Sequence, residues 1–458
     1  MYFCVDQTHF RMNLIQAALK KTTDTKACII GAGALREVPA LFRSQFKGCT
    51  ALVVADRNTW RAAGEEVARR LDAAGIPRLP SFIFDDPHLY AEWSYLEQLE
   101  AHLKEVDAIA VAVGSGVIND LAKLASSRLG RAYMVVGTAA SMDGYTAFGA
   151  SITYQGNKQT FACRAPRGLV IDPVIAAKAP EGMAASGYAD LMAKVPAGAD
   201  WIIAEAAGAE GIDPSGFELV QRTLRAALSK PDAVAARRVL ATEKLCTGLV
   251  MSGFAMQACR SSRPASGMEH QFSHYWDMEG LCFNGTPVSH GFKVGIGTLV
   301  STACLEYLLD TGLERIDAEE AAARWPSWEG QEKTIRTLFA EKPAHLERAL
   351  SESLAKYTDA DGVRNQLRRL QAAWPGLRER IRAQILPFST VYGHLRRAGA
   401  PYEPEMIGVS REHLRDTFRH IPYMRSRYTS IDLVLRAGLL PEVEEHLFGP
   451  GGPWAIPA

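Results

Sequence analysis

The sequence predicts an α/β N-terminal domain of the doubly wound, nucleotide-binding type, followed by an all-α C-terminal domain. Short β-branched runs alternate with helical segments from residue 27 to about residue 172. Apolar runs without polar alternation are typical of parallel strands that are covered on both faces. After Pro180 the strand signals stop, and Ala, Leu, Glu and Arg recur with the period of about 3.6 residues that marks helices. A chain of 458 residues is also too long for one ordinary core.

Six apolar runs are the predicted parallel strands of the first domain. They are ACIIG (27–31), TALVVAD (50–56), SFIFD (81–85), DAIAVAVG (107–114), RAYMVVG (131–137) and RGLVID (167–172). Between the last two, SITYQGNKQTFA (151–162) alternates apolar and polar residues, which predicts an antiparallel hairpin with Gly156 and Asn157 in its turn. The predicted domains are therefore residues 1–175, which bind the dinucleotide, and residues 176–458, which are helical and bind metal and substrate.

Charge and cysteine usage restrict the class of protein. Lysine plus arginine and aspartate plus glutamate number 51 each, so no global field favours nucleic acid or an anionic membrane as partner. The eight cysteines are scattered without a CxxC pair, as expected in a reducing compartment. The N-terminus lacks the pattern of a signal peptide and predicts a short helix, and no apolar run approaches the roughly 18 residues of a membrane span. We expect a soluble cytoplasmic protein.

The strongest nucleotide signal is GSGVIND, which follows the predicted strand ending at Gly114. Glycines at a strand-to-helix turn let the backbone approach a phosphate, and the N–H groups of the helix start favour an anion. A plain turn is the alternative. Asp56 ends the second strand, where an acid can accept hydrogen bonds from an adenine ribose and so favour NAD over NADP; the alternative is a helix N-cap.

A long loop of small residues, VVGTAASMDGYTAFGAS (135–151), follows the fifth predicted strand. Its low bulk is typical of a segment that faces a ligand. Asp143 is its only charged residue. The carboxylate is expected to meet a polyol or a ribose, unless Asp143 and Gly144 form a simple turn.

Three histidines fall within about twenty residues, and neutral imidazole is the commonest metal ligand in proteins. His270 and His274 are four residues apart, on one face of a predicted helix, and His290 precedes a glycine at a helix start. Two imidazoles need a carboxylate to complete a three-ligand site, and Asp190 in SGYADLMAKV is a candidate. The alternatives are buried structural histidines and an acid that complements a helix dipole.

Taken together, these segments resemble the glycerol-1-phosphate dehydrogenase family within the dehydroquinate synthase-like and iron-containing alcohol dehydrogenase superfamily. In chain order, the matching segments are GSGVINDLAK, TAASMDGY, GYADLMAKVPAGADW, SGMEHQFSH and HGFKVGIGTL. The helical region beyond residue 300 is similar to the extended bacterial form. The resemblance implies a homodimeric, metal-dependent NAD(P)-linked oxidoreductase of phospholipid metabolism, which interconverts sn-glycerol 1-phosphate and dihydroxyacetone phosphate.

The resemblance also implies the site residues. Asp190, His270 and His290 are expected to hold one divalent metal ion, which is zinc, nickel or iron. Asp143, Asp190 and His274 are expected to face the substrate, with Asp143 and His274 catalytic and His274 relaying the hydroxyl proton. NAD, or NADP as the alternative, is expected to contact Asp56, Gly114, Gly116, Val117, Ile118, Asn119, Asp120, Thr138, Ala139, Ala140 and Ser141.

Two positions depart from the family pattern. Ala147 stands where the family usually has serine, and Gly137 stands where proline is common, so we expect weaker cofactor binding. For the substrate phosphate, a local cation is required, and Lys293 or Lys194 is the predicted one. The alternative functions are a glycerol or other polyol dehydrogenase of the same superfamily, a dehydroquinate synthase-like cyclase, and an inactive nucleotide-binding homologue.

Overall fold

The computed structural model describes residues 13–457, which form two compact units. The first unit comprises Met1–Leu191 and Ser215–Ser262, and the second comprises Met192–Pro214 and Arg263–Ala458. The units cut across the predicted boundary at residue 175, because residues 176–191 and 215–262 pack with the sheet. The predicted N-terminal helix falls largely on residues 1–12, outside the described residues; residues 13–19 are helical.

The first unit is built on a six-stranded parallel sheet, which confirms the predicted α/β fold. Its strands lie in the order β1-β8-β5-β4-β2-β3, and each of the six predicted apolar runs contains one of them. The bounds are β1 (Ala27–Ile30), β2 (Ala51–Asp56), β3 (Phe82–Phe84), β4 (Ile109–Gly114), β5 (Met134–Gly137) and β8 (Gly168–Ile171). The chain leaves β2 in one direction toward β3 and then returns to build β4, β5 and β8 on the other side of β2.

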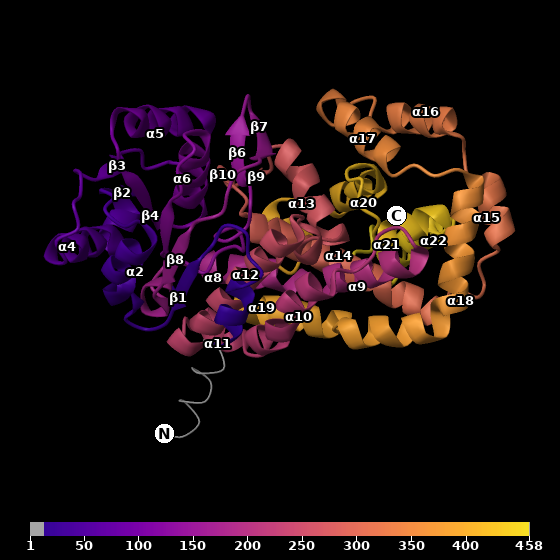
Figure 1. The fold of residues 1–458 in the computed structure, drawn as a ribbon. Helices are drawn as coiled ribbons and strands as arrows, with labels where there is room; N and C mark the ends of the chain where they lie inside the picture. The colour runs from indigo at the N-terminus through magenta and orange to yellow at the C-terminus, as the bar shows by residue number, and fades with distance from the viewer. Residues whose placement is uncertain (1–12, 458) are drawn as a thin grey trace, which may run out of the picture. The chain divides into compact units, whose positions relative to one another are not determined.

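Helices cover both faces of this sheet (Figure 1). Right-handed crossovers place α2 (Val38–Gln45) and α4 (Glu65–Ala73) on one face, and α5 (Trp93–Glu105) and α6 (Gly116–Arg128) on the other. The core of the first face joins Phe42 of α2 and Leu71 of α4 to Val53 and Val111 of the central strands. The sheet is doubly wound, as the alternation of runs predicts.

The reversal of strand order creates the place where such sheets bind ligands, outside the carboxyl ends of the strands on either side of it. Val54 pairs with Ala112, so two residues later Asp56 of β2 and Gly114 of β4 reach the same edge. Gly114 in turn pairs with Gly137 of β5. The predicted nucleotide-binding turn and the predicted ribose ligand therefore end neighbouring strands.

The predicted hairpin is present, but its turn lies one residue earlier than expected. β6 (Ala150–Tyr154) pairs antiparallel with β7 (Asn157–Phe161), and Asn157 is the partner of Tyr154 rather than a turn residue. Gln155 and Gly156 form the turn, both with positive φ, of 50° and 76°. Positive φ at both central positions matches the right-handed twist of the strands.

Helices from beyond the sheet complete the first unit. The remaining elements are η1 (Ala34–Glu37), α3 (Arg57–Thr59), η2 (Trp60–Gly64), α7 (Pro173–Ala176), α8 (Met183–Met192, whose last residue begins the second unit), α10 (Pro214–Leu228), α11 (Pro231–Ala235) and α12 (Val239–Cys259). Gln257 of α12 ties this layer to the sheet, since its side chain accepts from the backbone of Thr25 and donates to the Thr25 hydroxyl.

The second unit is helical apart from a two-strand ribbon, β9 (Cys282–Phe283) and β10 (Thr286–Pro287), which the sequence patterns do not predict. Its central pair is α13 (Met268–Met278) and α14 (His290–Thr311). The others are α9 (Lys194–Ala207), η3 (Arg263–Ala265), α15 (Ala318–Arg324), α16 (Trp328–Leu338), α17 (Pro343–Ala355), α18 (Ala360–Gln384), α19 (Phe388–Ala398), η4 (Pro404–Ile407), α20 (Arg411–His420), η5 (Ile421–Tyr423), α21 (Ser430–Arg436) and α22 (Leu440–Phe448).

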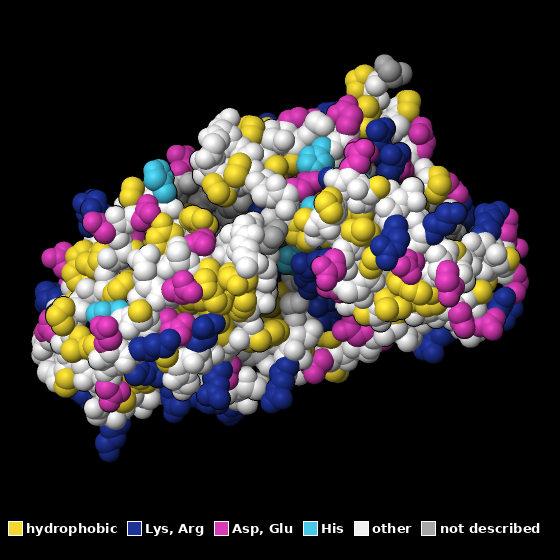
Figure 2. All heavy atoms as spheres, turned by 90° about the horizontal axis from the view of Figure 1, so that it is seen from above, with side chains coloured by type: hydrophobic (Ala, Val, Ile, Leu, Met, Phe, Trp, Pro, Cys, Tyr) yellow, Lys and Arg dark blue, Asp and Glu magenta, His cyan; other side chains and the backbone are white. Residues whose placement is uncertain are grey.

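Two helices, α12 and α14, are long and apolar enough by length and composition to cross a membrane. However, 78% and 83% of their most apolar windows are buried inside the protein, as in the core helices of globular proteins. On the face shown in Figure 2, basic and acidic side chains are mixed rather than separated into fields, which agrees with the equal numbers in the sequence. All seven described cysteines are free.

Candidate functional site

The turn between β4 and α6 is shaped by its first glycine. A Cβ on Gly114 would lie 2.5 Å from the Cβ of Ile118, so the chain can turn this tightly only with glycine there. Ser115, the N-cap of α6, makes no side-chain capping bond, and its hydroxyl lies 2.7 Å from that of Ser141. The first N–H groups of α6 therefore keep the character of an anion site.

The predicted cofactor residues fall into two groups by burial. Asp56, Gly116, Val117, Asp120 and Ser141 are part-exposed. Gly114, Ile118, Asn119, Thr138, Ala139 and Ala140 are buried. The side chains of the second group point into the protein, so these residues can offer a ligand only backbone groups.

Asn119 and Asp120 have structural partners, which their place in the GSGVIND motif did not reveal. The Asn119 carbonyl oxygen accepts from the Tyr133 hydroxyl at 2.9 Å. The Asp120 carboxylate accepts from the amide of Ser151 at 3.1 Å and from the Asn119 side chain at 3.2 Å. Burial raises the pKa of Asp120, although the neighbouring Lys123 charge acts in the opposite direction.

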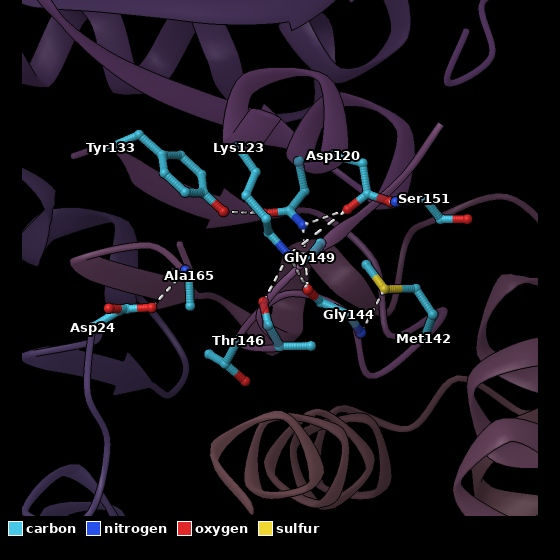
Figure 3. Close-up of polar contacts among 12 residues, drawn as sticks. Asp24, Asp120, Lys123, Tyr133, Met142, Gly144, Thr146, Gly149, Ser151 and Ala165 are labelled. Atoms are coloured by element: carbon cyan, nitrogen blue, oxygen red, sulfur yellow. Dashed lines mark hydrogen bonds and ion pairs between the residues drawn. The ribbon is translucent and has the colours of Figure 1, made fainter. Parts of the chain in front are cut away.

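Lys123 anchors the loop that follows β5 (Figure 3). Its ammonium group donates to three backbone carbonyls, those of Gly144 at 2.7 Å, Ala147 at 2.9 Å and Gly149 at 3.1 Å. The side chain is 0% exposed, and Asp120 lies 3.8 Å away. An ammonium group has three N–H donors, so all of them are used. Sequence reasoning missed this residue; the only signal was a lysine three residues after Asp120 on an otherwise apolar helix face.

The same loop packs closely against two helices of its unit. A Cβ on Gly187 of α8 would lie 2.0 Å from the Ala140 carbonyl oxygen, and one on Gly253 of α12 would lie 2.1 Å from the Thr146 hydroxyl. Thr146 also donates to the Val250 carbonyl at 2.9 Å. The loop predicted to face a ligand is thus held in one conformation from three sides.

Asp56 has the helix N-cap role that the sequence allowed, and its contact with a ribose stays a prediction. It is the N-cap of α3, and one carboxylate oxygen accepts from the amides of Asn58 at 2.7 Å and Thr59 at 2.8 Å. Among the described residues, no hydrogen bond reaches its second oxygen. The cap therefore leaves one oxygen available for a ribose.

Asp143 and Asp190 meet within the first unit. The amide of Asp143 donates to a carboxylate oxygen of Asp190 at 3.0 Å. The Ser252 hydroxyl of α12 donates to the Asp143 carboxylate at 2.9 Å. Asp190 lies in the last turn of α8 and is 0% exposed, whereas Asp143 is part-exposed. An unsupported acid in this position would be costly, so the carboxylate needs cationic or hydrogen-bonding partners.

The predicted metal histidines lie on the paired helices α13 and α14. His270 is in the first turn of α13, and His290 is the first residue of α14, with ring centroids 5.3 Å apart. Gly297 allows this approach, because a Cβ there would lie 2.4 Å from the carbonyl oxygen of Glu269. His274, one turn after His270, lies farther away, at 6.4 Å between centroids.

Nδ1 of His270 and Nδ1 of His290 each have a hydrogen-bond partner. Glu269 accepts from the amide of Gly267 at 2.6 Å, and the same carboxylate oxygen lies 2.8 Å from Nδ1 of His270, so it accepts that proton as well. Nδ1 of His290 lies 3.1 Å from the Ser273 hydroxyl. Both histidines therefore have Nε2 as the nitrogen for a metal, a common arrangement in metalloproteins. Burial raises the pKa of Glu269 to about 7.

The donor set fits a divalent cation. Asp190, His270 and His290 each offer one ligand atom, and these atoms lie within 4.8 Å of one another. Within the described part of the chain, these three side chains are the one group of acidic, histidine or cysteine residues that lie close enough together to hold an ion. One carboxylate and two imidazoles suit zinc, nickel or iron, and three protein ligands leave coordination positions open for a substrate.

His274 differs from the other two histidines. Its ring nitrogens make no hydrogen bond within the described residues, although the side chain is only part-exposed. Burial lowers its pKa well below the ordinary range, and the nearby Arg425 and Arg348 charges lower it further. This shift favours the neutral form of His274, in which one ring nitrogen carries no proton and is an acceptor.

Comparisons with known proteins show which proteins this chain is similar to. The family model for iron-containing alcohol dehydrogenase matches residues 29–180. The chain is 29% identical over 423 residues to a glycerol-1-phosphate dehydrogenase [NAD(P)+] of Bacillus velezensis, covering 92% of this chain and 93% of that protein. It is 32% identical over 273 residues to the enzyme of the same name from Methanosarcina mazei, covering 59% of this chain and 74% of that protein.

The chain belongs to the glycerol-1-phosphate dehydrogenase family. A crystal structure of glycerol dehydrogenase from Schizosaccharomyces pombe shares its fold, with a TM-score of 0.58 at 16% identity, covering 93% of this chain and 91% of that one.

The structure places Ala147 and Gly137, the two positions that are expected to depart from the family pattern. Ala147 is buried, and its carbonyl is one of the three that Lys123 binds. Gly137 ends β5, and a Cβ there would lie 2.9 Å from Ile171 and 3.2 Å from Tyr145. This glycine is thus closely packed rather than loosely placed.

The two lysines predicted to bind the substrate phosphate have different surroundings. Lys293 donates to Asp277 at 2.5 Å, so its charge already has a carboxylate partner. Lys194 is the first residue of α9 and is 0% exposed. These placements weaken both predictions, because a phosphate needs a reachable cation.

Proposed function

We propose that the protein is a metal-dependent NAD(P)-linked glycerol-1-phosphate dehydrogenase that interconverts sn-glycerol 1-phosphate and dihydroxyacetone phosphate. The observation that supports this most is the donor set of Asp190, His270 and His290, whose rings are oriented through Nδ1. The ordered match to relatives of that name along most of the chain supports the substrate.

Three ligands and two supporting residues form the proposed metal site. Asp190, His270 and His290 are the proposed ligands, and Glu269 and Ser273 keep the two rings in place. When bound, a divalent ion supplies Lewis-acid polarisation of the substrate's oxygen. Asp143 supports this geometry, because its amide donates to the Asp190 carboxylate. Its own part-exposed carboxylate, which accepts from Ser252, is the proposed partner of a substrate hydroxyl.

The proposed dinucleotide site and His274 take part in the transfer of hydride and proton. The edge formed by Asp56, the turn at Gly114 to Gly116 and the anchored loop at Ser141 is the proposed dinucleotide site. The nicotinamide cofactor carries the hydride, and the protein positions it. His274, neutral and without a hydrogen-bond partner among the described residues, is the proposed acceptor of the hydroxyl proton during oxidation.

The test is oxidation of NADH in the presence of dihydroxyacetone phosphate, after reconstitution with zinc, nickel or iron in turn. We expect turnover with at least one metal and much slower turnover with unphosphorylated dihydroxyacetone. Comparable rates on the unphosphorylated ketone would instead identify a polyol dehydrogenase. No net oxidation of NADH with either ketone would point to a cyclase or an inactive homologue.

The proposal also covers the metal, assembly and location. We propose one ion of zinc, nickel or iron per chain, a homodimer and a cytoplasmic location, where the free cysteines remain reduced. Elemental analysis of the purified protein and light scattering on a sizing column test the first two directly.

A further inference from the structure

A loop of the second unit brings an arginine pair toward His274. The loop runs from Met424 to Tyr428, between η5 and α21. The Ser426 amide donates to Glu352 of α17 at 2.6 Å, and the Arg427 side chain donates to the Ser266 carbonyl, just before α13, at 2.7 Å. The two residues that follow Arg425 are thus tied to α17, which carries Arg348, and to the segment just before α13, which carries His274.

Arg425 has no partner of its own. Among the described residues, its guanidinium makes no hydrogen bond and no ion pair, although the side chain is part-buried. Arg348 is only loosely paired, since its nearest carboxylate oxygen, on Glu352, lies 3.9 Å away and its other contact is the Met278 sulfur at 4.0 Å. Both side chains are part-exposed, so their guanidinium N–H groups are accessible to an anion from solvent.

The charges in this neighbourhood favour an anion. Arg425 and Arg348 are close enough to influence each other's charge, and Glu352 is the acid that opposes them. Both arginines also act on His274, whose nearby acid, Asp277, is committed to Lys293. Two guanidinium groups with one loosely placed carboxylate leave an excess of positive charge beside the proposed catalytic histidine.

We propose that Arg425, assisted by Arg348, binds the phosphate group of the substrate; this inference rests on the proposed function. A guanidinium presents two parallel N–H donors that match phosphate oxygens, and it stays charged when part-buried. The fixed loop presents this donor without a further ordering cost. Lys293 serves this purpose less well, because its ammonium already binds Asp277.

The test uses the full-length, metal-loaded protein with three single substitutions. Arg425→Gln and Arg348→Gln remove one charge each at the proposed site. Arg368→Gln removes the same charge from an exposed arginine of α18 that pairs with Glu319, and is the matched control. The probes are inorganic phosphate, measured by the shift in melting temperature against chloride at equal ionic strength, and the steady-state constants with dihydroxyacetone phosphate and with dihydroxyacetone.

We expect phosphate to raise the melting temperature of the parent and of Arg368→Gln, but not of Arg425→Gln. The KM for dihydroxyacetone phosphate should rise roughly 10- to 100-fold in Arg425→Gln and less in Arg348→Gln, as expected for loss of a charged hydrogen bond. The KM for dihydroxyacetone, which has no phosphate, should change much less than the KM for dihydroxyacetone phosphate. For Arg425→Lys we expect a KM for dihydroxyacetone phosphate between those of the parent and of Arg425→Gln, because lysine keeps the charge but loses the two parallel N–H donors.

The outcomes separate this inference from the proposed function. If the parent reduces dihydroxyacetone phosphate and Arg425→Gln does so with an unchanged KM, the phosphate site is elsewhere and the function stands. If the parent acts only on unphosphorylated ketones and phosphate shifts no melting temperature, both proposals fail. If phosphate binds through Arg425 but no phosphorylated ketone is reduced, the anion site stands and the function does not.

Discussion

Lys123 in the first unit and Arg425 in the second are basic residues with opposite surroundings. Lys123 of α6 is 0% exposed and donates all three N–H groups to carbonyls of the loop that follows β5. Arg425 is part-exposed and has no hydrogen-bond partner among the described residues. The first is a positioning residue, which shapes a loop, and the second is available to a ligand.

Other polar residues of the proposed sites differ in the same way. Asn119 and Asp120 belong to the motif that most suggested a nucleotide, yet both are bonded within their own unit. Nδ1 of His270 and Nδ1 of His290 each have a hydrogen-bond partner, whereas neither nitrogen of His274 has one among residues 13–457. Hydrogen-bond partners therefore distinguish residues that maintain the structure of a site from residues that can contact a ligand. A sequence motif alone does not show this difference.

The largest effect is expected at the residues proposed to hold the metal. His290→Ala should lose the bound ion and lower activity by about a thousandfold or more, since Lewis-acid polarisation contributes several kcal/mol. The fold should persist, because His290 is at a helix end and α14 keeps its Ser289 cap. Elemental analysis, circular dichroism and NADH oxidation measure the three properties.

His446→Ala is the matched control, because His446 is an exposed histidine of α22. It should change neither metal content nor rate. A His290→Ala protein with its full metal content would remove His290 from the ligand set, whatever its activity.

The next effect tests the positioning role of Lys123. Lys123→Met keeps much of the side-chain volume but leaves three buried carbonyls without their charged donor. We expect a loss of about 3 to 5 kcal/mol in the free energy of unfolding, as for other broken buried charge networks. NADH binding should weaken as well, because the loop that ends at Gly149 loses its anchor. Urea unfolding and NADH fluorescence titration measure the two effects.

Lys104→Met provides the comparison at an exposed lysine, which pairs with Glu100 and is 59% exposed. Its unfolding free energy should change by less than about 1 kcal/mol. If Lys123→Met were equally mild, the loop would be held by its contacts with α8 and α12 alone.

The sequence predicted the sheet well because buried parallel strands leave a local signal. Each of the six apolar runs became a strand, and the positions of Asp56, Gly114 and Gly137 at one edge follow from those runs and the strand order. The hairpin turn was misplaced by one residue, because Gln155 adopts a positive φ that its residue type does not suggest. The short β9–β10 ribbon was missed because two-residue strands carry no periodicity.

The candidate site was predictable only where a motif carried it. Asp190, His270 and His290 were selected by motif and are the group that could hold an ion. The role of Lys123 depends on carbonyls 21 to 26 residues away in the sequence. The role proposed for Arg425 depends on the surroundings of a loop that carries no motif. Likewise, nothing in HGFKVG indicates that Lys293 pairs with Asp277.

Two single substitutions at the β4–α6 turn distinguish a role of glycine in the tight backbone turn from a role in cofactor binding. Gly114→Ala should cost about 1 to 3 kcal/mol of stability, because its Cβ would lie 2.5 Å from the Cβ of Ile118. Gly116→Ala meets only Met142, at 3.5 Å, an ordinary contact, so its stability should be nearly unchanged. If the cofactor phosphate approaches this turn, Gly116→Ala should still weaken NADH binding several-fold. Unchanged NADH affinity in Gly116→Ala would move the phosphate away from the start of α6.

The smallest effect is expected at Asp56, which combines a helix cap with a proposed ribose contact. Asp56→Asn keeps an oxygen that can accept from the amides of Asn58 and Thr59, so the free energy of unfolding should change by less than about 0.5 kcal/mol, whereas Asp56→Ala should cost about 1 kcal/mol. Loss of the negative charge should raise kcat/KM for NADPH relative to NADH by about fivefold, as relief of one exposed like-charge repulsion. A cofactor ratio that stays constant in Asp56→Asn, with stability lost only in Asp56→Ala, would leave Asp56 as a helix cap alone and place it with Lys123 among the residues that build the site.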